Sequence, residues 1–304
     1  MDHDHGYKHL FSHPELVADL LRGFVREPWV EALDLSSLER VSGHYVTDDL
    51  RDREDDVVWR VQWDGGWCYV YLLLEFQSTV DRFMAVRLLT YLGLLYQDLI
   101  RAGELAPDGR LPPVLPLVLY NGERRWTAPL SLEELITKLP GGLDAYRPGF
   151  RYLLIDEGAF AAAELPARNL AAAVFELEHS RSPADLQAVV HRLVEWLQAP
   201  AQRSLRRAFS VWLGRVLIPG RFGDAPLPPS NDLREMETML SERVKEWQEQ
   251  WKQQGLEQGR EQGLEQGLVR GEAAVLLRQL DRRFGAGTAE RYRARIEGAD
   301  AETL

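Results

Sequence analysis

Three polar residues, Asp56, Glu75 and Gln77, flank apolar segments and could carry out metal-dependent chemistry. Glu75 ends a run without charge from Cys68 to Leu74, where an ionisable side chain needs a specific role. Two carboxylates held close together repel each other unless a proton or a divalent cation lies between them. An all-oxygen pair suits Mg²⁺ or Mn²⁺, so we expect Asp56 and Glu75 to bind such a metal ion.

A β-hairpin is the element that must position this pair. Segments 57–63 and 67–76 are rich in β-branched and aromatic residues, with glycines between them. If Gly65-Gly66 forms the centre of a type I′ turn, Asp56 lies opposite Glu75 on the neighbouring strand. The same register gathers the apolar residues on one face, so it predicts that both acids lie on the other face.

The two acids also allow a purely structural explanation. As residues at strand ends they could face water and pair with Arg60 or Arg87. Gln77 would share their face of the hairpin in the predicted register. The charge-free run before Glu75 favours the metal site over this alternative.

The surrounding pattern predicts an α/β domain followed by helices. Apolar residues at three- and four-residue spacing predict helices, and unbroken apolar runs predict strands. The expected order in the first 160 residues is a helix at 13–25, strands at 57–63 and 67–76, a helix at 80–102, a strand at 114–120, a short helix opening at Ser131 and a strand at 152–155. Further helical patterns cover 167–179, 184–198, 202–218 and 273–297.

These patterns divide the chain into four predicted parts. We expect an α/β domain, a helical extension, a repeat segment that is a helix or a linker, and a helical C-terminal segment: 1–160, 161–230, 231–272 and 273–304. The repeat segment has a glycine at every fourth position from 255 to 271. Such a stripe of small residues suits close helix pairing in a homodimer, and a flexible linker is the alternative.

Four sequence segments, in order, carry a family resemblance. They are Tyr7-Lys8-His9-Leu10-Phe11 after His3-Asp4; Asp56 followed by Tyr71-Leu72-Leu73-Leu74-Glu75-Phe76-Gln77; Met84-Ala85-Val86-Arg87-Leu88-Leu89-Thr90-Tyr91; and Leu115-Pro116-Leu117-Val118-Leu119-Tyr120-Asn121-Gly122. Together they resemble the recombination-promoting nuclease or transposase branch of the PD-(D/E)XK nuclease superfamily. The resemblance is strongest over 3–125, and 271–296 resembles a small C-terminal domain of unknown function.

The resemblance implies a restriction-endonuclease-like fold, with a mixed sheet flanked by helices, and a magnesium-dependent DNA endonuclease. Asp56 and Glu75 would hold Mg²⁺, with Mn²⁺ as a substitute. Gln77 stands where much of the superfamily has Lys, so a neutral amide would orient the attacking water or contact phosphate. Neighbouring acids such as Asp55 could share the site.

Three residues outside the hairpin are candidate substrate contacts. Arg87 and Tyr91 lie one helical turn apart and resemble polar and aromatic residues that follow the catalytic strand in related nucleases. Lys8 could contact a DNA phosphate. The structural alternatives are an Arg87–Glu75 salt bridge and a surface lysine whose aliphatic stem packs on the protein.

Composition argues against several other classes of protein. The 304 residues contain no apolar run long enough to span a membrane, no signal peptide at the start and one cysteine, so we expect a cytoplasmic protein without disulfides or a membrane partner. The net charge of −11 argues against a broad basic DNA-binding face. A metal ion between the acids and the phosphate would resolve that conflict.

Two other functions remain as alternatives. The first is a catalytically degenerate nuclease fold that acts as an interaction protein and assembles through its glycine-repeat helix. The second is a true transposase, although no zinc finger or clear helix-turn-helix is present to read DNA.

Overall fold

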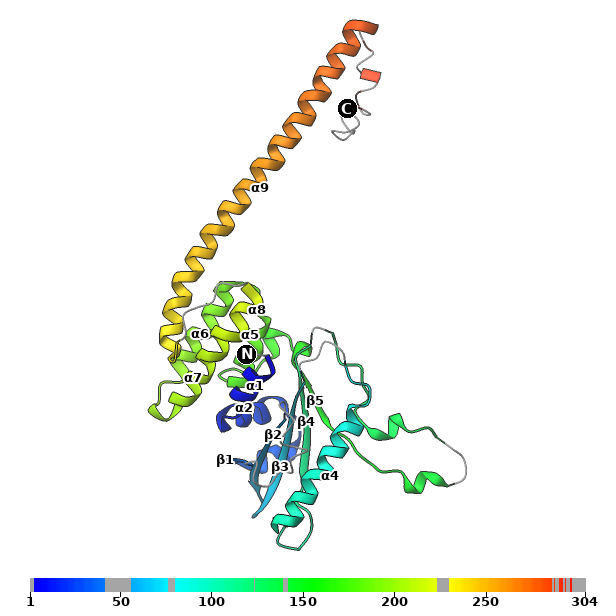
Figure 1. Ribbon diagram of the computed structural model, residues 1–304, viewed down its shortest axis with the longest axis vertical. Helices are drawn as coiled ribbons and strands as arrows, with labels where there is room; N and C mark the ends of the chain where they lie inside the picture. The colour runs from blue at the N-terminus through cyan, green and yellow to red at the C-terminus, as the bar shows by residue number, and fades with distance from the viewer. Residues whose placement is uncertain are drawn as a thin grey trace. The chain divides into compact units, whose positions relative to one another are not determined.

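The computed structural model describes most of the chain as an α/β sheet domain joined to a helical part (Figure 1). The described residues are 3–41, 56–75, 80–122, 124–138, 142–222, 230–285, 287, 290, 291, 293 and 296. They form two compact units, Met1–Leu240 and Ser241–Leu304. The expected α/β class is confirmed, and the predicted nuclease domain and helical extension fall within the first unit.

The strands form one five-stranded sheet in the order β1-β2-β3-β4-β5. They are β1 (Leu33–Arg40), β2 (Asp56–Trp63), β3 (Gly66–Glu75), β4 (Val114–Tyr120) and β5 (Leu153–Asp156). β1, β2 and β3 pair antiparallel, whereas β3, β4 and β5 pair parallel. The sheet is therefore mixed, and its three parallel strands end at the same edge.

The hairpin exists, but its predicted register was wrong by two residues. Asp64 and Gly65 both have positive φ angles, 49° and 76°, so these two residues form the centre of the turn. Trp63 consequently pairs with Gly66, and Asp56 lies opposite Leu73 rather than opposite Glu75. Asp-Gly is a preferred pair for a type I′ turn, which explains why the turn moved one residue towards the N-terminus.

Strand β1 was not predicted from the sequence. Its residues are mostly leucine, serine and charged types, with no β-branched or aromatic side chain among them. It forms the edge of the sheet, and its register against β2 shifts between Asp34 and Glu39. An irregular edge strand lacks the strict apolar alternation by which a strand is predicted from sequence.

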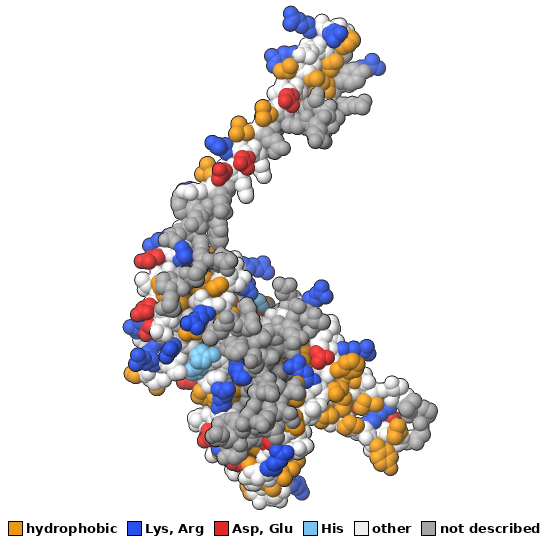
Figure 2. Space-filling model, viewed as in Figure 1, with side chains coloured by type: hydrophobic (Ala, Val, Ile, Leu, Met, Phe, Trp, Pro, Cys, Tyr) orange, Lys and Arg blue, Asp and Glu red, His pale blue; other side chains and the backbone are white. Residues whose placement is uncertain are grey.

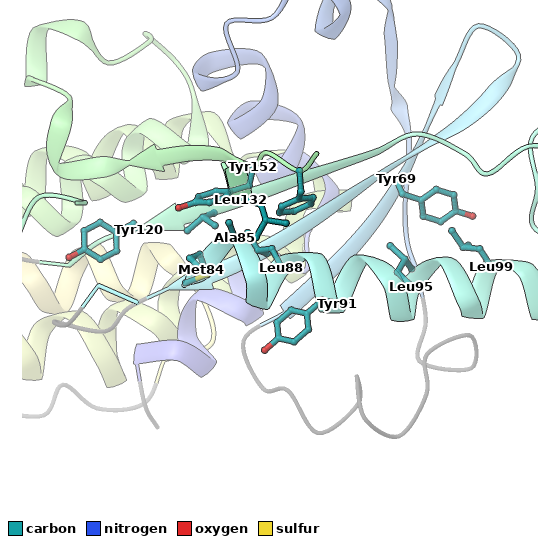
Figure 3. Close-up of a cluster of buried hydrophobic side chains, with 12 residues drawn as sticks. Tyr69, Met84, Ala85, Leu88, Tyr91, Leu95, Leu99, Tyr120, Leu132 and Tyr152 are labelled. Carbon is teal, nitrogen blue, oxygen red and sulfur yellow. The ribbon is translucent and has the colours of Figure 1, made fainter. Parts of the chain in front are cut away.

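One face of the sheet is covered by α4 (Met84–Ala102). Figure 3 shows the buried side chains that join this helix to the strands, and Leu88, Leu95, Val118 and Tyr152 belong to this cluster. Tyr69 of β3 packs in it too. Strand positions that share a face with Tyr69 therefore belong to the α4 side of the sheet.

The opposite face of the hairpin carries the apolar row predicted from the sequence, with Val57, Trp59 and Val70 buried. Helices α1 (His3–Leu10) and α2 (Pro14–Phe24) lie on this side, and Trp59 Nε1 donates a hydrogen bond to Phe11 O at 3.1 Å. This packing ties the start of the chain to the sheet.

The helical part of the first unit follows β5. It contains α5 (Leu170–His179), α6 (Pro183–Trp196), α7 (Arg203–Trp212), a π-helical turn (Leu213–Leu217) and α8 (Ile218–Phe222). α5 packs on α2, and α7 packs on α1. The predicted helices are thus confirmed, and they pack against the sheet domain through its N-terminal helices.

A single helix, α9 (Leu233–Phe284), covers the glycine repeat. Its 52 residues span about 78 Å at 1.5 Å per residue. Ala273, Leu277 and Ile296 form a small buried cluster near its C-terminal end. The described part of the chain contains no helix long and apolar enough to cross a membrane.

Candidate active site

The carboxyl ends of the parallel strands form the sheet edge at which the predicted acids lie. Glu75 at the end of β3 pairs in register with Tyr120 of β4, and Tyr120 pairs with Asp156 of β5. Asp56 begins the antiparallel strand β2 at this same edge. Open α/β sheets usually bind ligands outside the carboxyl ends of their strands. This edge is therefore the candidate active site.

Asp56 and Glu75 occupy diagonal positions on neighbouring strands. Because Asp56 pairs with Leu73, Glu75 stands two residues further along β3. Alternation along the strands assigns both positions to the face that α4 covers. Diagonal neighbours on one face lie about 7–8 Å apart at Cα, which is within reach of a shared ligand. The corrected register therefore keeps the two acids on one face, as neighbours.

A divalent metal ion fits this donor set by its chemistry. Mg²⁺ commonly takes one or two carboxylates, keeps several waters and binds substrate phosphate, so it does not need a cage of protein ligands. Among the described residues no three His, Cys, Asp or Glu side chains gather as a metal cluster. Gln77 lies in 76–79, outside the described residues.

Arg87 and Tyr91 form a structural pair on α4. Arg87 is half-buried, and its Nε donates a hydrogen bond to the Tyr91 hydroxyl at 2.9 Å. Tyr91 is only 2% exposed and packs in the core cluster. Tyr91 therefore holds the Arg87 guanidinium in place on the helix. Both residues lie on the helix that covers the face assigned to Asp56 and Glu75.

Arg60, a structural partner considered for the acids, is paired elsewhere. Its guanidinium contacts Glu39 Oε2 at 2.8 Å and Glu104 Oε2 at 3.3 Å. It also lies over the Trp67 ring, 4.4 Å from the ring centroid. Arg60 therefore has a complete structural role without Asp56.

Lys8 belongs to α1, which lies beside β3. The lysine is half-buried and directly follows Tyr7, whose ring is fully buried. α1 therefore holds Lys8 near the hairpin, on the side of the sheet opposite to α4.

A buried polar cluster beyond the ends of β4 and β5 was missed in the sequence reading. The Tyr7 hydroxyl donates a hydrogen bond to Glu157 Oε2 at 3.4 Å, and it also interacts with Asn121 and Glu178. Arg221 of α8 reaches Glu178 Oε2 at 3.5 Å. The cluster thus joins α1, the two strand ends, α5 and α8.

Burial dominates the electrostatics of this cluster. Burial raises the pKa of Glu157 well above its ordinary value, and the nearby Glu178 carboxylate raises it further. The hydrogen bond from Tyr7 and the charge of Arg221 oppose that shift in the pKa. Burial also raises the pKa of Tyr7, with Glu157 and Glu178 adding to the effect. Burial therefore favours the neutral form of Glu157.

Part of this arrangement had a signal in the sequence. Tyr7 and Asn121 belong to two of the segments that carry the family resemblance, but no role was assigned to them. Gly122 is also explained, because a Cβ there would overlap the Tyr120 ring, whose hydroxyl donates to Arg124 O at 2.7 Å. Glu157 had no signal, since its partner Tyr7 is 150 residues away in sequence.

Comparison with known proteins gives several relatives in Escherichia coli. Recombination-promoting nuclease RpnA of strain K12 is 32% identical over 120 residues, which are 40% of this chain and 40% of the relative. Recombination-promoting nuclease RpnD of O157:H7 is 33% identical over 122 residues, 40% of this chain and 46% of the relative. The matches span less than half the length of these relatives.

A third relative carries a different description. The inactive recombination-promoting nuclease-like protein RpnE of strain K12 is 32% identical over 121 residues, which are 40% of this chain and 39% of the relative. No solved structure gives a significant match to the chain.

The sequence profile of the family described as "Putative transposase, YhgA-like" matches residues 1–206. This range includes the whole sheet, the candidate active site and helices α1, α2, α4, α5 and α6. Because the match covers more than half of the chain, the protein belongs to the YhgA-like transposase family.

Proposed function

We propose that the protein is a magnesium-dependent DNA endonuclease that hydrolyses phosphodiester bonds, in the biology of recombination or of mobile elements and defence. Asp56 and Glu75 hold Mg²⁺, or Mn²⁺ in its place. The bound ion would neutralise charge on the scissile phosphate and favour ionisation of a water molecule. The partner is DNA.

The protein's own groups complete the proposed chemistry. Gln77 orients the attacking water through its amide, which can donate and accept hydrogen bonds. Arg87 contacts a DNA phosphate. The Tyr91 hydroxyl holds the guanidinium in position by accepting the 2.9 Å hydrogen bond from Arg87 Nε. Lys8, which lies on α1 at the opposite face of the sheet, contacts a different DNA phosphate.

One observation carries this proposal. The two acids of the nuclease-like motif are 19 positions apart in sequence, yet strand pairing makes Asp56 and Glu75 diagonal neighbours at the sheet edge. The nuclease descriptions of RpnA and RpnD support the same chemistry, because the chain resembles both relatives.

A catalytically degenerate interaction protein is the second candidate. The relative RpnE is described as inactive although it matches this chain as well as RpnA does, at 32% identity. In this case the fold would persist, and the chain would act by assembly.

We also propose that the chain forms a homodimer through the glycine repeat of α9. Leu256, Leu264 and Leu268 are 60–68% exposed along this helix. Figure 2 shows apolar side chains along this segment, and a groove of about 780 Å³ runs beside Gly263, Gly267 and Gly271. A second α9 would cover these leucines, and the glycines would permit a close approach.

Plasmid nicking with purified protein tests the nuclease proposal. We expect Mg²⁺-dependent nicking by the natural protein and none by Glu75→Gln, which removes a charged metal ligand and keeps the side-chain size. Glu133→Gln is the matched control, because Glu133 is exposed and lies in a different part of the unit. Absence of nicking by the natural protein with Mg²⁺ or Mn²⁺ would favour the interaction protein.

A further inference from the structure

A cavity of about 740 Å³ lies beside the carboxyl end of β5, next to α5, α6 and α8. Three arginines are among its lining residues, namely Arg181, Arg192 and Arg221, together with His179 and Gly158. The cavity belongs to the first unit and is separate from Asp56 and Glu75. Three carboxylates, Glu176, Glu178 and Asp185, also line the cavity, so it is a concave surface of mixed charge with several guanidinium groups.

A fourth arginine, in the segment after β4, lies next to Gly158 of the cavity wall. Arg125 Nη1 lies 3.6 Å from Asp156 Oδ1, and its side chain is 63% exposed. A Cβ on Gly158 would lie 3.1 Å from this Nη1 atom. Glycine at position 158 therefore leaves room for Arg125 at the cavity wall.

The arginines are held to different degrees. Arg221 donates hydrogen bonds to Ser180 O at 3.3 Å and Glu178 Oε2 at 3.5 Å. Arg192 pairs with Glu176. Arg181 is exposed and forms no ion pair with any residue that the structure describes. Its charge is thus available to a ligand, and the long contacts of Arg125 and Arg221 leave N–H groups for one too.

Three of these arginines also act on the charge state of His179. Burial lowers the pKa of His179, and the charges of Arg221, Arg125 and Arg181 lower it further, against an opposing effect of Asp156. These effects favour the neutral imidazole. The positive charge of the cavity belongs to the arginines, so it persists across the neutral range.

Strand register gives the position of the cavity relative to the proposed cleavage site. Glu75, Tyr120 and Asp156 are successive partners across β3, β4 and β5. Two strand spacings separate Asp156 from Glu75, which is about 10 Å. Asp156 is the residue that Arg125 contacts, so this arginine would lie near a phosphate neighbouring the one at the proposed cleavage site.

We propose that Arg125, Arg181 and Arg221 bind a backbone phosphate of the DNA substrate near the scissile bond but distinct from the scissile phosphate. The inference rests on the proposed nuclease function and extends its substrate surface beyond the metal site. Guanidinium groups match phosphate oxygens in a two-bond geometry, and such contacts position DNA without reading its sequence. The arginines give an acidic chain a local set of phosphate-binding groups, beside the carboxylates that share the cavity wall.

Binding without cleavage tests this inference. Fluorescence anisotropy of a labelled DNA duplex with the full chain in EDTA, from about 50 to 200 mM KCl, measures affinity and its salt dependence. We expect Arg125→Gln with Arg181→Gln to weaken binding at least tenfold, and the log–log salt slope to fall by about 0.9 for each lost contact. Arg125→Gln combined with Arg181→Lys should recover most of the lost affinity, because lysine keeps the positive charge at position 181.

Arg26→Gln is the matched control, since Arg26 is also exposed but lines a different cavity near β1. Unchanged affinity and slope in the double variant would overturn the inference, as would a natural protein that binds no DNA at low salt. Inorganic phosphate at constant ionic strength could raise the melting temperature of the natural protein but not of the double variant. If the two proteins then bind DNA equally well, the cavity takes a free anion and the inference is wrong. Failure of the nuclease proposal is seen separately, as nicking that does not depend on Asp56.

Discussion

Two glycines of the packed first unit and two glycines of α9 have opposite environments. In the first unit, a Cβ on Gly6 would lie 2.7 Å from the Trp212 ring, and one on Gly23 would lie 2.8 Å from Asn169 Nδ2. In α9, a Cβ on Gly259 or Gly263 would meet no atom within 4 Å. The first group is explained by contacts within the chain, because α1 and α2 could not approach α7 and α5 so closely with larger residues.

The α9 glycines have no such explanation within one chain. Glycine in a helix costs about 1 kcal/mol relative to alanine, and the repeat places several of them at four-residue spacing. A close helix–helix contact with a second copy would offset that cost. The comparison therefore separates glycines with close contacts inside the chain from α9 glycines without them, and it supports the proposed pairing of α9 with a second copy.

Gly23→Ala is expected to give the largest effect and to test the first half of the comparison. The new methyl group would press on Asn169 Nδ2 and on Pro166 Cγ, at 2.8 and 2.9 Å. Asn169 caps α5 by accepting a hydrogen bond from Ala172 N at 2.8 Å, so it cannot move freely. We expect the free energy of unfolding in urea to fall by about 1–3 kcal/mol.

Gly93→Ala is the matched control for this prediction. Gly93 is an exposed residue within α4, and a Cβ there meets no atom within 4 Å. The change should stabilise the helix by up to about 1 kcal/mol. Equal effects of the two substitutions would show that close packing does not explain Gly23.

Leucine at Gly259, Gly263 and Gly267 tests the second half of the comparison. The bulky side chains should prevent close approach of two α9 helices and convert the proposed dimer to a monomer in light scattering. The urea midpoint of the first unit should stay unchanged. A natural protein that is monomeric at micromolar concentrations, or a leucine variant that stays dimeric, would contradict the pairing.

Glu157→Gln should change how the stability of the first unit depends on pH, without changing α9. The folded pKa of Glu157 is raised above its ordinary value near 4.5 by burial, so the folded state binds the proton more tightly than the unfolded state. The natural protein therefore loses stability as the pH rises above about 4.5 towards the raised folded pKa. The Gln variant does not lose stability in this way. Its free energy of unfolding should therefore exceed that of the natural protein by more at pH 8 than at pH 5.

Urea unfolding at both pH values measures that difference. Exposed Glu133→Gln provides the control, and the helical signal of α9 should not follow the change. An advantage of Glu157→Gln that is the same at pH 5 and pH 8 would mean that Glu157 is charged in the folded protein.

Alanine at the same three α9 glycines should have the smallest effect on assembly. Alanine remains small enough for close helix packing and is the better helix former. We expect dimer mass to be retained and α9 helicity by circular dichroism to rise slightly. Loss of the dimer on this change would mean that even a methyl group is too large at the interface.

Local patterns were enough to predict most elements of the fold but not their exact register. The apolar alternation of the hairpin predicted both strands and their shared face. The turn centre depended on Asp64 adopting a positive φ of 49°, which the Gly65-Gly66 reading did not include. Strand β1 was missed because its sequence, Leu33 to Arg40, has no β-branched or aromatic residue.

The candidate site divides in the same way. Asp56 and Glu75 could be predicted as neighbours because a motif and a hairpin bring them together over a short stretch of sequence. Glu157 and Arg221 were not found, because their partners come from helices distant in sequence and packed by tertiary contacts. Only the packed structure shows that an apparently ordinary strand-end glutamate is buried beside Tyr7.

The most direct test of the account is supercoiled plasmid nicking by the natural protein and by Asp56→Ala, with Mg²⁺ and with EDTA. Asp56 starts β2 at the sheet edge, so its truncation should remove a metal ligand and leave the core intact. We expect nicking only by the natural protein with Mg²⁺, and equal urea stability of the two proteins. Nicking by Asp56→Ala at the natural rate would contradict the assignment of this sheet edge as the active site.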